Sequence, residues 1–264
     1  MEAREIRKSH EQESVRPSGR VYIYGRNAVR ECLLAGRRKV YRLLVAYSHS
    51  ASQTLEVIES LAARSGLQIE RVERSILDRL THGANHQGVV IEASEFSYSS
   101  IEDLLASGEL RGKDILMLDS LQDPQNFGTL LRTAEVFGIG AVIIPEHRSV
   151  EVTPAVVNAS SGATEHLNIS KVTNLARTAS KLKEYGYWVL GLEYDESSSV
   201  IWDVDLRIPI CLVVGSEGSG IRELVRKRCD LLVKIPQAGR IGSLNAAVAG
   251  SIALYEIYKS KSSK

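Results

Sequence analysis

Apolar residues occur along the chain in two blocks, and in both blocks short apolar runs alternate with segments of helical spacing. In the first block, apolar residues between 28 and 34 predict a helix that begins at Asn27 and ends at Gly36. The other runs of this block are typical of a small α/β unit. They predict helices over 54–65 and 75–80 and strands over 40–48, 67–72 and 88–93.

The second block holds longer apolar runs such as ILML, VII and CLVV. Runs of this kind indicate strands of a parallel sheet that helices cover on both faces. The expected strands are 114–120, 141–145, 187–193, 209–215 and 231–236, and the expected helices are 126–137, 154–161, 173–185, 220–228 and 244–258. The sequence therefore predicts an α/β fold.

Polar segments set the expected domain boundaries. Residues 1–19 are polar and charged and predict a disordered tail. After the tail we expect a first domain over 20–95, a polar linker over 96–112 and a second domain over 113–259.

Composition narrows the class of protein. Of the 264 residues, 44% are hydrophobic and 25% are charged, as in globular proteins. No apolar stretch is long enough to cross a bilayer and no signal region is present, so we expect a cytoplasmic protein without a membrane partner. Cys32, Cys211 and Cys229 are scattered, which argues against a disulfide framework or a bound metal.

The net charge of +1 hides a basic segment near the N-terminus. Between residues 16 and 42 there are eight lysines and arginines and a single acid, Glu31. This asymmetry suits contact with phosphates, although an ordinary solvated surface explains the charge equally well. The candidates for binding RNA are Arg26, Arg37, Arg38 and Lys39.

Three loops follow strands of the second block, at the sheet edge where ligands collect in parallel sheets. In the first loop, over 118–138, Asp123 and Pro124 open a turn, Asn126 is suited to cap the next helix, and Arg132 lies nearly two turns into it. A cap and a solvated arginine explain most of this loop. Its polarity nevertheless exceeds what a turn requires.

The second loop, over 213–224, places glycines at 215, 218 and 220. This spacing differs from the dinucleotide pattern, no Walker lysine is present, and Glu217 would repel a phosphate. The loop suits a ligand without phosphates that the backbone approaches closely, and S-adenosylmethionine (AdoMet), with its cationic sulfonium, meets that description. A plain tight turn would need only one or two of these glycines.

The third loop, over 234–256, is irregular and precedes a helix of small residues that Ser243 is suited to cap. Asn245 would need hydrogen-bond partners if it were buried beside that helix. Taken alone, this segment is most simply a tightly packed helix.

Together and in this order, the three segments resemble the three motifs of the SpoU (TrmH) family of RNA 2′-O-ribose methyltransferases, over 114–258. The segments YGRNAVRECLLAGRRKVYRLLVA and HQGVVIEA resemble the ribosomal-protein-like substrate-binding domain of one subgroup. That subgroup methylates a guanosine of 23S ribosomal RNA near the peptidyl-transferase centre. Related enzymes that act on other ribosomal or transfer RNAs carry similar domains.

The resemblance implies a parallel-sheet domain with a deep trefoil knot, AdoMet as cofactor, structured RNA as substrate and a homodimer. The residues implied to contact the cofactor are Gly215, Gly218, Ile235 and Leu244. The polar residues implied at the reaction centre are Asn126, Arg132, Glu217, Ser243 and Asn245. The third motif departs from the usual pattern at Gln237 and at Ala246-Ala247, where Met and a Val-Ser pair are more common.

The resemblance makes Arg132 the residue proposed as the base, but a guanidinium stays protonated in proteins. We therefore expect Arg132 to clamp a substrate phosphate and polarise the ribose hydroxyl, with Glu217 orienting it through a charge-assisted bond. Asn126, Ser243 and Asn245 would align the ribose. Methyl transfer needs no metal.

Three other hypotheses remain at this point. The nearest is the same reaction on a transfer RNA. A catalytically silent RNA-binding or ribosome-assembly protein would have lost Asn126, Arg132, Glu217 or Asn245, and all four are present. A nucleotide-binding enzyme is disfavoured by the glycine spacing and by Glu217.

Overall fold

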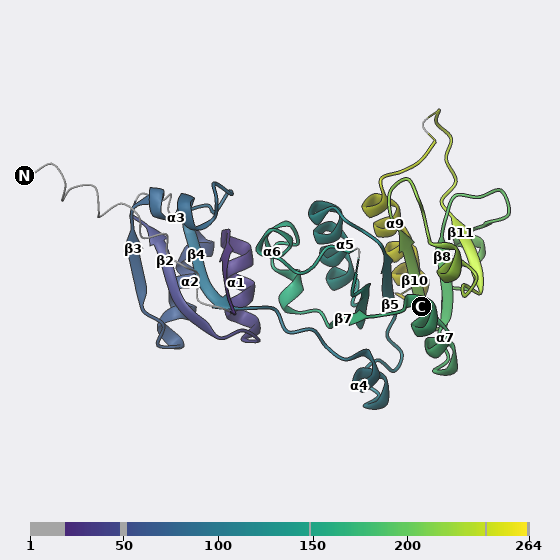
Figure 1. The fold of residues 1–264 in the computed structure, drawn as a ribbon, viewed down its shortest axis with the longest axis horizontal. Helices are drawn as coiled ribbons and strands as arrows, with labels where there is room; N and C mark the ends of the chain where they lie inside the picture. The colour runs from purple at the N-terminus through teal and green to yellow at the C-terminus, as the bar shows by residue number, and fades with distance from the viewer. Residues whose placement is uncertain (1–18, 48–51, 148, 241, 263–264) are drawn as a thin grey trace, which may run out of the picture.

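The computed structural model describes residues 19–47, 52–147, 149–240 and 242–262, which form two domains side by side (Figure 1). The tail expected over 1–19 lies outside the described residues except for Gly19. Within the described ranges, no helix is long and apolar enough to cross a membrane.

The first domain is a four-stranded sheet in the order β1-β4-β2-β3. Its elements are β1 (Arg20–Tyr24), α1 (Arg26–Ala35), β2 (Val40–Ala46), α2 (Gln53–Arg64), β3 (Ile69–Val72), α3 (Arg74–Leu80) and β4 (Val89–Ser94). Ile23, Leu43 and Ile91 form a core on one face with α1 and α2, and Leu77 of α3 packs on the other face. Strand β1 adds to the expected elements. Helix α1 begins after Gly25 without a side-chain cap, so the start expected at Asn27 is wrong.

The second domain is a seven-stranded sheet in the order β7-β6-β5-β10-β8-β11-β9, with every strand pair parallel. Its strands are β5 (Ile115–Asp119), β6 (Ala141–Pro145), β7 (Ile169–Val172), β8 (Trp188–Leu192), β9 (Ser199–Val200), β10 (Ile210–Gly215) and β11 (Leu231–Lys234). Its helices are α4 (Ile101–Ala106), α5 (Pro124–Val136), α6 (Pro154–Ala159), α7 (Leu175–Glu184), α8 (Glu223–Arg226) and α9 (Ala246–Ser262), with short 3-10 turns η1 (Ala163–Glu165) and η2 (Ile201–Asp203).

Both faces of this sheet are buried, as the continuous apolar runs predict. Leu116 and Leu212 pack in one core with residues of α5 and α9, and Met117 and Val213 pack in a second core with residues of α7 and α8. The expected parallel sheet is confirmed. The deep knot that the resemblance implies stays a prediction.

Two expected boundaries are wrong. The helix expected over 220–228 is shortened to α8, because the residues before Glu223 form a loop that is tied to strand β5. The segment 96–112, expected as a linker, is packed into the second domain. Ile101 and Leu110 are buried in its core, and Phe96 lies edge-on to Tyr98 at 5.1 Å between ring centroids.

The two domains meet where α1 faces α6 (Figure 1). Val157 of α6 completes the core of the first domain, and Asn158 Nδ2 donates to the Tyr24 carbonyl oxygen at 3.0 Å. Arg38, expected on the RNA-binding surface, is instead only 7% exposed. Its Nε and Nη2 each donate to the Glu165 carboxylate at 2.8 Å. Arg38 therefore joins the domains and is not available to RNA.

Candidate active site

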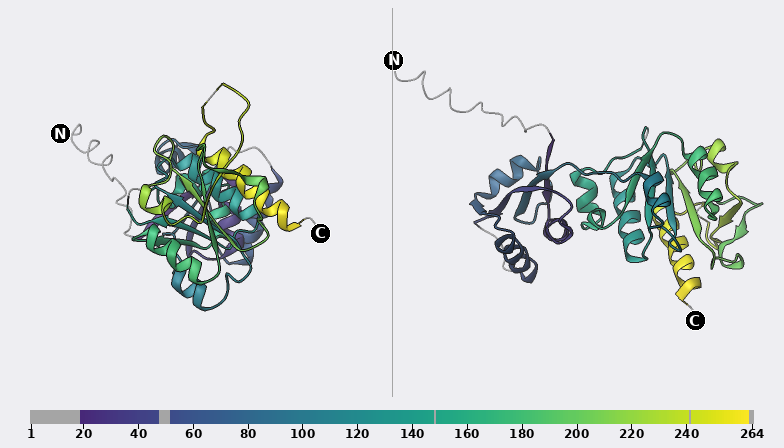
Figure 2. Two further views of the ribbon diagram at one scale, coloured as in Figure 1. Left: turned by 90° about the vertical axis from the view of Figure 1, so that its right-hand side faces the viewer. Right: turned by 90° about the horizontal axis from the view of Figure 1, so that it is seen from below.

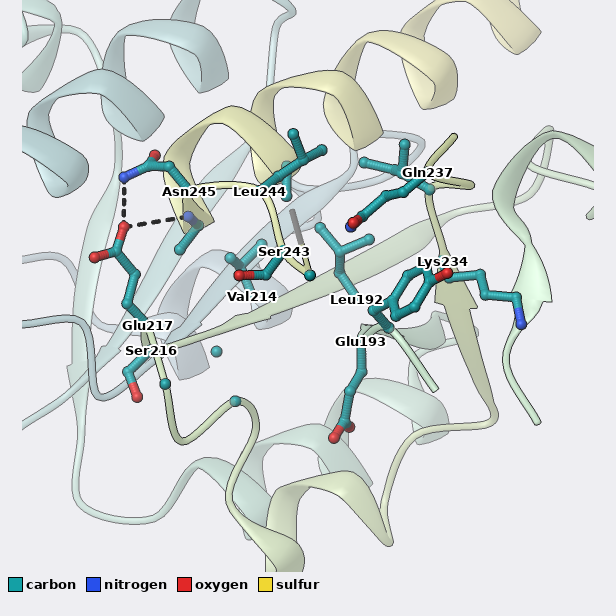
Figure 3. Close-up of a pocket in the computed structure, with 18 residues that line it drawn as sticks. Leu192, Glu193, Val214, Ser216, Glu217, Lys234, Gln237, Ser243, Leu244 and Asn245 are labelled. Carbon is teal, nitrogen blue, oxygen red and sulfur yellow. Dashed lines mark hydrogen bonds between the residues drawn. The ribbon is translucent and has the colours of Figure 1, made fainter. Parts of the chain in front are cut away.

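A cavity of about 690 Å³ opens at the carboxyl ends of β8, β10 and β11 (Figure 3). Its apolar part comes from the ends of β8 and β10 and from residues after β11, and its polar part comes from the loop after β10 and the start of α9. The lining includes Leu192, Val214, Gly215, Glu217, Gly218, Lys234, Ile235, Gln237, Ser243, Leu244 and Asn245. The sheet thus brings together all of the cofactor-contacting residues expected from the sequence.

One carboxylate oxygen organises the polar side of the cavity. Glu217 Oε1 accepts from Asn126 Nδ2 at 3.0 Å and also from Asn245 Nδ2. Asn245 Nδ2 lies 2.9 Å from Asn126 Oδ1, so the three side chains form a closed triangle. Figure 3 shows Glu217 and Asn245 on one side of the cavity, with Leu192 and Gln237 on the other.

Helix caps explain the positions of the Asn126 and Asn245 side chains. Asp123 caps α5 by accepting from the amides of Gln125 and Asn126, at 3.2 and 3.1 Å. The side chain of Asn126 is thereby free to reach Glu217, and its expected role as the cap is wrong. Asn245 Oδ1 accepts from the amides of Ala247 and Val248, at 2.9 and 3.1 Å. Asn245, and not Ser243, therefore caps α9.

Gly215 brings two stretches of backbone into contact. A Cβ on this residue would lie 2.2 Å from the carbonyl carbon of Gly220, where side chains do not fit. The loop closes through Ser216 N to Gly220 O at 3.2 Å and Gly220 N to Ser216 O at 3.0 Å. Gly220 has a φ of +64°, a left-handed conformation that favours glycine. The glycine spacing therefore builds a tight loop against the cavity.

Asp119, which was not among the residues expected from the sequence, anchors this loop. Asp119 ends β5 and is fully buried, and its carboxylate accepts from Arg222 N at 2.8 Å and from Arg222 Nε at 2.6 Å. These bonds tie the loop after β10 to the neighbouring strand. An acidic residue at the end of the otherwise apolar run ILMLD was the available signal.

Arg132 lies on exposed helix surface and is not paired with Glu217. Its Nη1 donates to Ser161 Oγ at 3.2 Å, and Glu217 is occupied by the two asparagines. The expected bond between Glu217 and Arg132 is therefore wrong. Of the candidates for RNA, Arg37 Nη1 donates to the Leu167 carbonyl at 2.8 Å, Arg26 Nε donates to the Gln87 carbonyl at 3.2 Å, and Lys39 Nζ lies 5.3 Å from the centroid of the Tyr41 ring.

The chemistry of the lining fits a ligand that has an apolar part and carries a positive charge. Leu192, Ile235 and Leu244 supply apolar contact, and Glu217 supplies a carboxylate. Lys234 extends away from the cavity (Figure 3), and its Nζ donates to the carbonyls of Asp195 and Glu196 at 2.9 and 3.2 Å. In the segment that Lys234 contacts, the Ser197 hydroxyl lowers the pKa of the Asp195 carboxyl below its usual range. Among the described residues, no His, Cys, Asp or Glu cluster is suited to hold a metal.

Two family models cover the two domains. The model described as the SpoU rRNA methylase family matches residues 113–255, more than half of the chain. The model described as RNA 2′-O ribose methyltransferase substrate binding matches residues 22–99. The chain belongs to the SpoU (TrmH) family. It is an AdoMet-dependent RNA 2′-O-ribose methyltransferase, which confirms the resemblance.

Curated relatives of this SpoU enzyme match almost end to end. A Bacillus subtilis protein assigned to the TrmH family of tRNA/rRNA methyltransferases is 40% identical over 242 residues, covering 91% of this chain and 96% of its own. A Staphylococcus haemolyticus protein of the same assignment is 37% identical over 243 residues, with the same coverage.

Solved structures share the fold. The SpoU methyltransferase AviRb of Streptomyces viridochromogenes, crystallised with AdoMet, superposes with a TM-score of 0.77 at 21% identity, covering 93% of this chain and 92% of its own. An rRNA methyltransferase of Sinorhizobium meliloti gives a TM-score of 0.74 at 24% identity, with coverage of 91% and 87%. The SpoU fold of the second domain and the attached first domain are therefore shared with known enzymes.

Proposed function

We propose that the enzyme methylates the 2′-hydroxyl of a guanosine ribose in 23S ribosomal RNA, near the peptidyl-transferase centre. The observation that supports the reaction is the triangle of Asn126, Glu217 and Asn245 beside the cavity. The choice of RNA rests on the resemblance of the first domain to one subgroup.

Mapping of 2′-O-methyl groups tests the target. Ribosomal RNA from cells that lack the gene should lose one methyl group at a 23S guanosine, and the gene should restore it. The same mapping on transfer RNA is the control. If a methyl group were lost from a transfer RNA and the 23S pattern stayed intact, the target would be that transfer RNA and not 23S ribosomal RNA.

The cavity residues are proposed to hold AdoMet largely through backbone. Gly215, Gly218, Ile235 and Leu244 would contact it. When bound, AdoMet supplies an electrophilic methyl group on a sulfonium. Isothermal titration should therefore detect AdoMet and no binding of ATP or NAD. Binding of ATP in this cavity would contradict the assignment, because Glu217 repels phosphates.

The polar triangle is proposed to align the ribose. The carboxylate of Glu217 fixes the amides of Asn126 and Asn245, and fixed amides hold a hydroxyl in one orientation for attack. Ser243, on the same cavity wall, would complete this side. Glu217 thus orients the two asparagines and not Arg132.

Arg132 is proposed to clamp the substrate phosphate and to polarise the ribose hydroxyl. Its charge lowers the pKa of a nearby hydroxyl, so that water can take the proton as the methyl group is transferred. Arg132→Lys tests the clamp, because lysine keeps the charge and loses the two-pronged geometry. A large fall in kcat is expected, and near-full activity would disprove the two-pronged contact.

A second copy of the chain is the proposed protein partner. Val136, Tyr255 and Tyr258 are 64%, 48% and 46% exposed, and Phe137 stacks on Tyr258 at 5.2 Å between centroids. Helix α9 carries the two tyrosines along the outer side of the second domain (Figure 2). Light scattering should give twice the monomer mass, and Tyr258→Glu should shift it toward the monomer. A monomer for the native chain would exclude the homodimer.

A further inference from the structure

Arg132 is held by a residue to which the family resemblance gives no role. Its Nη1 donates to Ser161 Oγ at 3.2 Å. In the part of the chain that the structure describes, Ser161 is the one side chain bonded to this guanidinium. A long exposed arginine otherwise samples many rotamers, so a fixed acceptor restricts where its remaining donors point.

The backbone of Ser161 is in an uncommon conformation. Its φ is +55°, in the left-handed region that non-glycine residues rarely adopt. Residues keep such a conformation where their surroundings fix it, and these residues are concentrated at functional sites. The next residue, Gly162, also has a positive φ, of +89°. The turn between α6 and η1 is therefore shaped to present the Ser161 side chain.

The first domain presses on this turn. A Cβ on Gly162 would lie 2.6 Å from Glu31 Cβ and 3.2 Å from Ala28 Cα, so α1 sits directly against it. Glu31 Oε2 also lies 2.8 Å from His166 Nε2, just beyond η1. With the Arg38–Glu165 pair at the end of η1, these contacts hold the turn from the side of the first domain.

Helix α5 presses on the same region from the other side. A Cβ on Gly128 would lie 2.5 Å from Ala159 Cβ and 2.9 Å from Ser160 N, so α5 packs closely on the end of α6. Arg132 follows Gly128 by four residues and therefore lies on the same helix face. The turn and the arginine are thus placed against each other by close backbone packing.

We propose that Ser161 is a positioning residue for Arg132: its hydroxyl fixes one arm of the guanidinium so that the other donors face the substrate phosphate. This inference rests on the proposed clamp. A hydroxyl is a neutral acceptor, so it orients the guanidinium without neutralising the charge that the phosphate requires. A carboxylate in its place would compete with the phosphate.

Two substitutions separate the hydroxyl from the backbone. Ser161→Gly removes the hydroxyl and relieves the positive φ, and we expect kcat to fall about tenfold because a bond to a charged group is lost. The KM for AdoMet should not rise, and the midpoint of thermal unfolding should not fall. Ser161→Asn tolerates a positive φ and supplies an amide oxygen, so it should recover most of kcat. His82→Gly is the control for relief of a positive φ alone, because His82 has a φ of +53°.

A double-mutant cycle decides whether Ser161 acts through Arg132. In an Arg132→Ala background, Ser161→Gly should cause no further loss of kcat. Wild-type kcat in Ser161→Gly, or an equal tenfold loss in both backgrounds, would overturn the inference.

The controls separate this inference from the function on which it rests. If the wild-type enzyme forms no 2′-O-methylribose in any RNA, the proposed function fails. If Arg132→Ala stays fully active, the clamp fails and the positioning role fails with it. If Arg132→Ala keeps only a small, measurable part of kcat and Ser161→Gly is fully active, only the inference about Ser161 fails.

Discussion

Asn126 and Glu217 are 91 residues apart in the chain, and Asn126 Nδ2 donates to Glu217 Oε1 at 3.0 Å. The bond joins the helix after β5 to the loop after β10, two strands that are neighbours in the sheet. Asn245 completes the contact from the start of α9. Three distant segments therefore depend on one carboxylate for their alignment.

Glu217→Ala should weaken AdoMet binding about tenfold or more, because Asn126 and Asn245 lose an ionised acceptor and the cavity wall loosens. Glu217→Gln keeps an acceptor oxygen and should stay within about threefold of the wild type. Titration calorimetry measures both dissociation constants. The control is Glu223→Gln, since Glu223 is 77% exposed on its side chain. Equal affinities for Glu217→Ala and the wild type would contradict this role.

The glycines of the loop should differ in their tolerance of a side chain. Gly215→Ala places a Cβ against Gly220 and should reduce AdoMet affinity at least about tenfold, because the loop must open. Gly218 has open space around it and a φ of +84°, so Gly218→Asn should cost much less. The two dissociation constants, measured side by side, check the ranking. A Gly218 variant that binds worse than the Gly215 variant would reverse it.

Arg38→Ala should lower the free energy of unfolding by about 3–5 kcal/mol, because Glu165 remains buried without its partner. The matched control is Arg42→Ala. Arg42 pairs with Glu70 on the surface, with both side chains 43% exposed. It also lies 3.8 Å from the Glu92 carboxylate, but Glu92 keeps Arg20 as a partner at 3.0 Å, so the loss of Arg42 should cost about 1 kcal/mol or less. Urea denaturation compares the two variants. Similar values would mean that the Arg38 pair contributes no more than a surface pair.

Stability should fall between pH 10 and about 12, partly through Tyr187. Burial raises the pKa of its hydroxyl from 10.0 to about 12, with Asp114 and Cys211 adding to the shift. Below pH 10 the phenol is neutral in both states. Between the two values only the unfolded chain loses this proton, so ionisation favours unfolding. Tyr187→Phe should make the unfolding free energy fall less steeply with pH. The buried cysteine thiols are present in both proteins, so they do not account for a difference between the two slopes. Unchanged slopes would exclude Tyr187 as a source.

Apolar runs predicted the sheet because they record burial along the chain, and they placed three polar loops at strand ends. The individual cavity residues came from the family resemblance of those loops. Local patterns did not predict partners far apart in sequence. Asp123 and Asn126 are both capping residue types, and only Glu217 decides which one caps α5. Arg38 looked like one basic residue among many, since its partner Glu165 lies 127 positions away. Asp119 was passed over for the same reason, with Arg222 lying 103 positions away.

The presence of Val157 in the core of the first domain has a consequence for how such proteins are recombined. A fragment that ends before residue 96 contains the first domain without α6, and its core would have an apolar hole in place of Val157. A methyltransferase domain from another protein would have to fill that hole with a side chain of matching shape. The first domain is therefore not an interchangeable module. A chimera that exchanges RNA specificity between relatives must carry α6 and the turn after it together with the first domain.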